Sequence, residues 1–278
     1  MKSRKLIILY MLLLLIAIVS MMVLYKSSRP IVSRDYQEIH SEGVLRIVTE
    51  YNQLGYYVSG DTIKGFQYEL SRAISELSGL EIQTSLEMSL SESFNGLVNN
   101  QYDIIARNIP VTSEIKDNYL FTDPVVFNKQ VLVQRMAEAN DSIPPIRNQL
   151  ELAGKTLYIP EDSPALLRII NLQHEIGDTI YIIQESHYSS EQLIIMVAKG
   201  DIDYAVCDLQ IAVVSKKILP EIDIDTDISF TQLQAWAVRK ESPVLLDSLN
   251  HWFRMIRDNG IYDAIYKRYY SQKSGNNR

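Results

Sequence analysis

Three charged side chains stand where a binding site for a charged solute could form. Glu50, Arg107 and Asp208 each follow an apolar stretch with a strand pattern. A carboxylate at a strand end can pair with a cation in a surrounding of low dielectric, and a guanidinium can hold an anion. Structural roles are the alternative: Asp208 could cap a helix that starts near Leu209, and Arg107 could be an ordinary surface residue.

Neutral polar side chains near these positions could complete such a site. They are Asn108, Thr112, Tyr51, Tyr56 and Tyr57. The first two could donate hydrogen bonds to a ligand, and tyrosines at the mouth of a cleft can both stack and hydrogen-bond. Because the chain has 17 tyrosines, their chance placement in this loop is the alternative.

A helix start supplies a further candidate. Ser163 is predicted to be an N-cap, with Pro164 at the first helical position. Free backbone N–H groups at such a start suit an anionic group of a ligand. The neighbouring carboxylate of Asp162 would repel that group, so the two effects oppose each other.

Nothing in the sequence specifies catalysis, a metal or a cofactor. Cys207 is the sole cysteine, which excludes an intrachain disulfide and a metal site built from several cysteines. We expect Cys207 itself to be a small residue of the core. The histidines have no paired metal-ligand spacing, and no glycine-rich phosphate loop is present. The net charge of −7 makes a nucleic-acid partner unexpected.

The N-terminus predicts a membrane anchor. Residues 6–25 contain no charge, and 20 residues of helix match the thickness of a bilayer core. No A-x-A-like cleavage site follows, which favours a retained single-pass anchor over a cleaved signal peptide. The basic residues Lys2, Arg4 and Lys5 predict a cytoplasmic N-terminus and a body on the periplasmic or extracellular side.

Beyond residue 30, the pattern predicts a two-lobed α/β protein. Residues 31–43 are mixed and polar and suggest a tether. Strand and helix patterns then alternate, which is typical of parallel sheets. They fall into two sets: residues 44–128 with 232–278 form lobe 1, and residues 129–231 form lobe 2. Strands near 130 and 232 are predicted to cross between the lobes, with a ligand cleft between them.

Six short stretches in order give the chain a family resemblance. They begin at Gly43, Gly65, Tyr102, Phe121, Gly200 and Asp258 and read GVLRIVT, GFQYEL, YDIIA, FTDP, GDIDYAV and DNGIY. Over about residues 38–272 the chain resembles the family 3 extracellular solute-binding proteins, which have the type II periplasmic binding fold. Within them, it is most similar to the non-catalytic N-terminal module of the membrane-bound lytic transglycosylase F family.

The resemblance implies roles for particular residues. An aspartate of lobe 2 holds the ligand's ammonium in amino-acid-binding members, and Asp208 matches it. An acidic residue often contacts the ligand's side chain at the position of Glu50. The arginine that meets the ligand's carboxylate is replaced by Ile115, which cannot make that contact. Arg107 is the candidate replacement, from another direction. At the position of Asp162, the family has a small residue that this chain lacks.

The function implied is that of a membrane-anchored binding protein that closes two lobes around a small polar ligand. Such a protein would deliver an amino acid, a short peptide or a cell-wall fragment to an ABC permease, or would sense this ligand and regulate a cell-wall partner such as a peptidoglycan enzyme. One alternative is a degenerate module that acts as a protein-interaction scaffold. Another, minor one is a prephenate or arogenate dehydratase with Glu50 or Asp208 as the acid. Glu185 resembles a lytic glutamate, but it lies within lobe 2 and no lysozyme-like domain is expected.

Overall fold

The computed structural model describes residues 11, 13–18, 20–22 and 34–270. The chain divides into two units, Met1–Ser33 and Arg34–Arg278. The predicted anchor at residues 6–25 lies partly outside the described residues, and those described within it are helical. Among the residues that the structure describes, no helix is both long and apolar enough to cross a bilayer.

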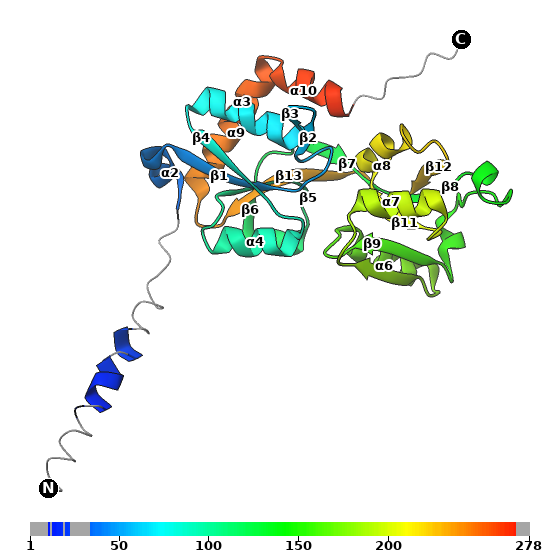
Figure 1. Cartoon of the computed structure of the whole chain (residues 1–278), viewed down its shortest axis with the longest axis horizontal. Coiled ribbons are helices and arrows are strands. Elements are labelled where there is room, and N and C mark those ends of the chain that lie inside the picture. The colour runs from blue at the N-terminus through cyan, green and yellow to red at the C-terminus, as the bar shows by residue number, and fades with distance from the viewer. Residues whose placement is uncertain (1–10, 12, 19, 23–33, 271–278) are drawn as a thin grey trace, which may run out of the picture. The chain divides into compact units, whose positions relative to one another are not determined.

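The second unit contains two lobes, each built on its own sheet (Figure 1). The sheet of lobe 1 has the order β4-β1-β5-β13-β6, with β7 also paired to β13. Its strands are β1 (Val44–Thr49), β4 (Glu81–Leu86), β5 (Ile104–Pro110), β6 (Tyr119–Phe121), β7 (Val126–Asn128) and β13 (Gln232–Arg239). Strand β1 runs parallel to β4 and β5. Glu50, which follows β1, and Arg107, which lies in β5, are therefore brought toward the same edge of the sheet.

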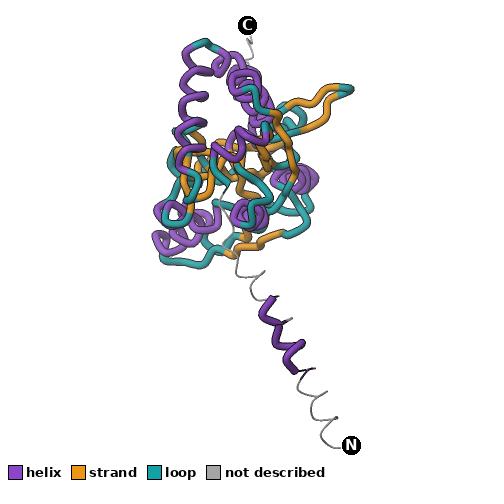
Figure 2. The backbone as a smooth tube through the Cα atoms, turned by 90° about the vertical axis from the view of Figure 1, so that its left-hand side faces the viewer, coloured by secondary structure: helices purple, strands orange, loops and turns teal. Residues whose placement is uncertain are grey.

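Helices cover both faces of the lobe 1 sheet (Figures 1 and 2). Helices α3 (Phe66–Ser78), α9 (Pro243–Asp258) and α10 (Ile261–Tyr269) lie on one face, and α4 (Leu90–Val98) lies on the other. Phe66, Trp236 and Phe253 are fully buried under the first group, whereas Leu97 packs on Val48 under α4. Burial on both faces explains why β1 and β5 are almost continuously apolar.

Lobe 2 repeats the arrangement around a second sheet with the order β10-β9-β11-β8-β12. Its strands are β8 (Gln130–Arg135), β9 (Thr156–Pro160), β10 (Tyr181–Glu185), β11 (Ala205–Asp208) and β12 (Ile222–Asp227). Its helices are α6 (Ala165–Ile176), α7 (Ser190–Lys199) and α8 (Leu209–Lys216). Strands β9 and β11 are parallel, which brings their carboxyl ends and the starts of α6 and α8 to one edge.

The chain passes between the lobes twice, at positions that lie side by side. Lys129 separates β7 from β8, and residues 228–231 separate β12 from β13. The carbonyl of Gln130 accepts from Ile228 N at 2.9 Å, and Ser229 Oγ accepts from Gln130 N at 2.9 Å. Two short, hydrogen-bonded connections of this kind form a hinge.

The segment predicted as a tether is partly folded onto lobe 1. Residues 36–42 form α2 (Tyr36–Glu42), which Asp35 and Glu38 begin with a capping box and which buries Ile39 completely. The buried Arg34 donates to Asp103 at 3.0 Å, and Arg239 contacts the same carboxylate at 3.2 Å. Sequence patterns predicted no helix here because the segment is polar. The structure uses some of these polar residues to cap the helix and to form ion pairs.

A tight crossing of two loops fixes the segment after β1. Gly65 has a φ of +139°, and a Cβ there would lie 2.2 Å from the carbonyl oxygen of Gly55. Only glycine permits this approach, which holds the loop after Glu50 against the start of α3. A hairpin of β2 (Tyr57–Ser59) and β3 (Thr62–Lys64) fills the connection between the two glycines.

Candidate functional site

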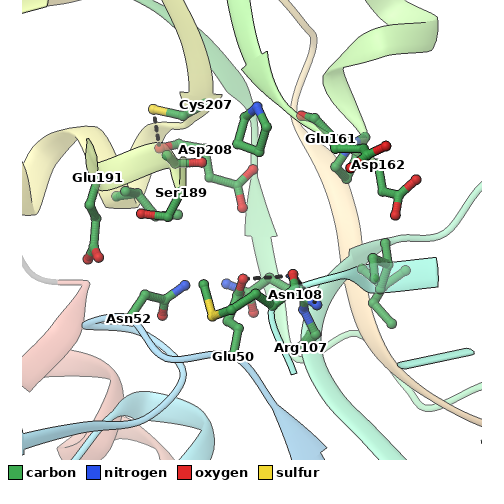
Figure 3. A pocket seen from close by; sticks show the side chains of 18 of the residues that line it. Glu50, Asn52, Arg107, Asn108, Glu161, Asp162, Ser189, Glu191, Cys207 and Asp208 are labelled. Carbon is green, nitrogen blue, oxygen red and sulfur yellow. Dashed lines mark hydrogen bonds and ion pairs between the residues drawn. The ribbon is translucent and has the colours of Figure 1, made fainter. Parts of the chain in front are cut away.

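A polar cavity of about 100 Å³ lies between the two lobes (Figure 3). Lobe 1 contributes the ends of β1 and β5, and lobe 2 contributes the ends of β9 and β11 with the starts of α6 and α7. Its charged lining comprises Glu50, Arg107, Glu161, Asp162, Glu191 and Asp208. Five carboxylates therefore face one guanidinium, so the cavity favours a cation.

Asp208 lines this cavity from the side of lobe 2. Its Oδ1 accepts from the side-chain amides of Gln130 and Gln234, the latter at 3.4 Å. Its Oδ2 has no hydrogen-bond donor among the described residues. Although Asp208 stands at the N-cap position of α8, its side chain makes no capping bond there. The capping alternative is therefore wrong, and the carboxylate faces the cavity.

Burial and charge together hold a proton on Asp208. Loss of water is the larger effect and the negative charge of Glu50 the next, and they raise the pKa of the Asp208 carboxyl to about 7. Bonds from the two glutamines and the charge of Arg107 oppose the shift. A cation that enters the cavity would stabilise the ionised form and displace that proton.

Arg107 is committed to Glu50 rather than available to a ligand's carboxylate. Its Nη2 lies 2.7 Å from Glu50 Oε2, and its Nη1 donates to the carbonyl of Met88 at 3.3 Å. The side chain is 12% exposed, so the surface alternative is also wrong. The ion pair leaves Glu50 with one oxygen that has no donor among the described residues.

The remaining candidates of lobe 1 lie outside the cavity or are already bonded. Asn108 lines it but accepts from Gln67 and donates to Tyr270, at 2.7 and 2.8 Å. Tyr51, Tyr56 and Tyr57 do not line it. Tyr56 packs edge-on against Tyr68 with centroids 5.4 Å apart, because the loop crossing at Gly55 turns it toward α3.

The candidate helix start of lobe 2 is shifted by one residue from its prediction. Pro164 occupies the N-cap position and α6 begins at Ala165. The hydroxyl of Ser163 accepts from Ala165 N at 3.3 Å, and Ser163 lines the cavity. Asp162 has a φ of +60°, and its carboxylate points to the other lobe, where it accepts from Ser89 Oγ at 3.0 Å.

The prediction missed several residues of the site, among them Gln130, Glu161 and Glu191. Glu191 lies at the start of α7 beside Asn52 (Figure 3). Its Oε1 accepts from Gln53 N of lobe 1 at 3.3 Å. Burial raises the pKa of the Glu191 carboxyl. The helix start was evident in the sequence, but an acidic residue in a first turn is ordinary helix chemistry, so no signal pointed to the cleft.

A larger, apolar groove of about 450 Å³ adjoins the polar cavity. The two share Leu90, Ile109, Asp162, Ser163 and Pro164 in their linings. Thr112 and Ile115 lie in this groove rather than in the polar cavity, so Thr112 is separated from the carboxylates with which it was predicted to act.

Residues 45–272 match the sequence model of the bacterial extracellular solute-binding proteins, family 3. The chain belongs to this family. The resemblance inferred from the six stretches is therefore confirmed.

Curated relatives are membrane-bound lytic murein transglycosylases F. That of Desulfosudis oleivorans is 30% identical over 84% of this chain and 50% of its own length. That of Photobacterium profundum is 25% identical over 85% of this chain and 45% of its own. The chain thus spans about half the length of these relatives.

Solved structures confirm the two-lobed fold. A mutant of ArgBP from T. maritima aligns with a TM-score of 0.72 at 23% identity, over 85% of this chain and 99% of that one. An ancestral amino acid-binding protein, described as a precursor of cyclohexadienyl dehydratase, aligns with a TM-score of 0.72 at 19% identity, over 84% and 99%. At these identities the likeness concerns the fold.

Proposed function

We propose that the protein binds a small solute bearing an ammonium group and closes its lobes around it. The observation that carries this proposal is the free oxygen of Asp208 in a cavity that Glu50 and Glu191 also face. An ammonium placed there would pair with carboxylates from both lobes at once. Such a ligand would favour the closed state by its contacts with both walls.

The neighbours support a ligand of this class. Four of the similar solved structures are described as bound to arginine, which carries an ammonium and a guanidinium. The excess of carboxylates in the cavity of this chain suits a cationic solute in the same place. An amino acid, a short peptide or a peptidoglycan fragment with a free amine all meet this requirement.

Calorimetric titration of the full chain in mild detergent tests the proposal. Simple amines, amino acids, short peptides and peptidoglycan fragments form the panel. We expect an amine-bearing ligand to bind and Asp208→Ala to abolish its binding. Asp247→Ala, at an exposed position on α9, is the control and should bind normally. Unchanged affinity in Asp208→Ala would remove Asp208 from the site.

We further propose that residues 6–25 anchor the body outside the cytoplasm. The observation in support is the uncharged 20-residue run behind three basic residues. Alkaline phosphatase fused to the C-terminus should then be active, and an inactive fusion would refute this orientation.

The relatives favour one partner role over delivery to an ABC permease. The chain matches about half of the length of relatives that are named membrane-bound lytic murein transglycosylases. We therefore favour the role of a regulator of a peptidoglycan enzyme. Ligand-dependent change in the activity of such an enzyme on isolated murein would support it. Stimulation of a permease's ATPase instead would support delivery.

A dehydratase activity rests on one neighbour, the precursor of cyclohexadienyl dehydratase. Product formation from prephenate or arogenate, checked alongside the binding panel, would establish it.

A further inference from the structure

The apolar groove is open to the polar cavity along five shared residues, so one ligand can occupy both. Its walls come from both lobes. Phe94 and Ile115 lie on the lobe 1 side, and Leu166 and Leu167 lie on α6 of lobe 2. An apolar group that entered the groove would therefore bridge the lobes, as the ammonium does in the cavity.

The groove supplies no cation for a ligand's carboxylate. Arg168 is the sole basic residue of its described lining, and its Nε donates to the carbonyl of Ile228 at 2.9 Å. Its Nη1 lies 2.7 Å from Glu175 Oε1. Glu114 and Asp162 are the other charged residues there. With Arg107 paired to Glu50, both guanidiniums near the ligand space are already neutralised.

The cavity itself opposes a ligand carboxylate. Five carboxylic side chains line it, and Arg107, the one guanidinium of that lining, is paired to Glu50. A ligand carboxylate would add a sixth acidic group to this set, and the negative charges among them would repel it.

We propose that the ligand is a primary amine that carries an apolar substituent and no free carboxylate. Its ammonium lies among Asp208, Glu50 and Glu191, and its substituent fills the groove between Phe94 and Leu167. This inference rests on the proposed function and names the class of solute for the same site. It differs from an amino-acid specificity, because Arg107 and Arg168, the guanidiniums that line the two compartments, are already paired to Glu50 and Glu175.

Three matched probes test the two parts of this inference by calorimetric titration of the full chain at pH 8. Phenethylamine has the amine and an apolar ring, ethylamine lacks the ring, and phenylalanine adds a carboxylate. We expect phenethylamine to bind at least tenfold more tightly than ethylamine, since burial of an aromatic side chain contributes about 1.5–3 kcal/mol. We also expect phenylalanine to bind at least tenfold more weakly than phenethylamine.

A pair of variants on one helix locates the ring. Leu167 is 50% exposed, so Leu167→Gln should fold, and it should weaken phenethylamine about fivefold or more without affecting ethylamine. Ile170→Gln changes a neighbouring exposed residue of α6 that does not line the groove, and it should leave both affinities unchanged.

The outcomes separate this inference from the proposed function. Equal affinities for phenethylamine and ethylamine, both lost in Asp208→Asn, would overturn the groove and leave the cavity in place. Tighter binding of phenylalanine than of phenethylamine would overturn the exclusion of carboxylates. Absence of binding by all three probes would overturn the inference, while the amino-acid and peptide panel would still decide the proposed function.

Discussion

Asp208→Asn should remove a charge from the cavity and keep the hydrogen bonds around it. The asparagine Oδ1 can still accept from the amides of Gln130 and Gln234, which contact Oδ1 of the native residue. The variant therefore isolates the cost of ionising this side chain in the folded protein. Its effect on stability should depend on pH, because the native carboxyl is neutral in acid.

The magnitude follows from the raised pKa of Asp208. An unfolded aspartate has a pKa near 3.9 and the folded one is at about 7. Because the pKa of Asp208 is higher in the folded state than in the unfolded state, the neutral carboxyl favours folding. This contribution to the free energy of unfolding is complete below pH 4 and is lost as pH rises through 7. Three units correspond to at most about 4 kcal/mol, and the partial exposure of Asp208 reduces this to about 2 kcal/mol.

Thermal unfolding of the full chain at pH 4 and pH 8 measures the effect. We expect Asp208→Asn to melt close to the native protein at pH 4 and about 4–8 °C higher at pH 8. Asp247→Asn, on the exposed side of α9, is the matched control and should show no such difference. An equal shift at both pH values, or a lower melting temperature at pH 8, would refute the assignment of a costly charge to Asp208.

Further predictions concern the ion pair, the contact between lobes, the proton and the loop crossing. Arg107→Gln leaves Glu50 without its partner and should lower the free energy of unfolding by about 1–3 kcal/mol in urea titrations; no change would contradict a structural ion pair. Asp162→Ala removes a bond between lobes and should increase the radius of gyration of the unliganded chain in X-ray scattering; identical profiles would contradict this. The affinity for phenethylamine should rise up to tenfold from pH 5 to pH 6, since Asp208 must lose its proton, and a flat profile would exclude that coupling. Gly65→Ala should destabilise the chain by more than about 1 kcal/mol in urea titrations, because its Cβ would meet the Gly55 carbonyl; native stability would show that the crossing relaxes.

Sequence patterns predicted the two-lobed fold because each buried strand is short, apolar and followed by an amphipathic helix. The same patterns placed Glu50, Arg107 and Asp208 at strand ends, and the structure brings these three to one cavity. The predicted strand end before Arg107 is wrong, because β5 continues through Arg107 to Pro110. Strand ends are predictable in this way because parallel strands share an edge.

Side-chain direction in loops was not predictable. Tyr56, for example, lies beside the crossing of Gly55 and Gly65, which depends on a contact between segments. Glu191 reaches the cavity only because lobe 2 faces lobe 1 at Gln53. Such residues are determined by tertiary packing, which leaves no local pattern. The helix at residues 36–42 was missed for a similar reason, since Arg34 is buried by a partner far along the chain.

The ion cluster of Arg34, Asp103 and Arg239 fixes the start of the described body to lobe 1. Asp103 immediately precedes β5 and Arg239 ends β13, so the cluster ties the entry of the described body to the central strands of lobe 1. Helix α10, at the other end of the described body, packs on α3 of that lobe. A load applied at either end would therefore be carried by lobe 1. Lobe 2 is joined to lobe 1 covalently only through the two hinge connections, and its other described contacts with lobe 1 include the hydrogen bonds of Asp162 and Glu191. If the lobes close on a ligand as proposed, a partner that senses an occupied cleft would therefore detect the position of lobe 2 relative to lobe 1.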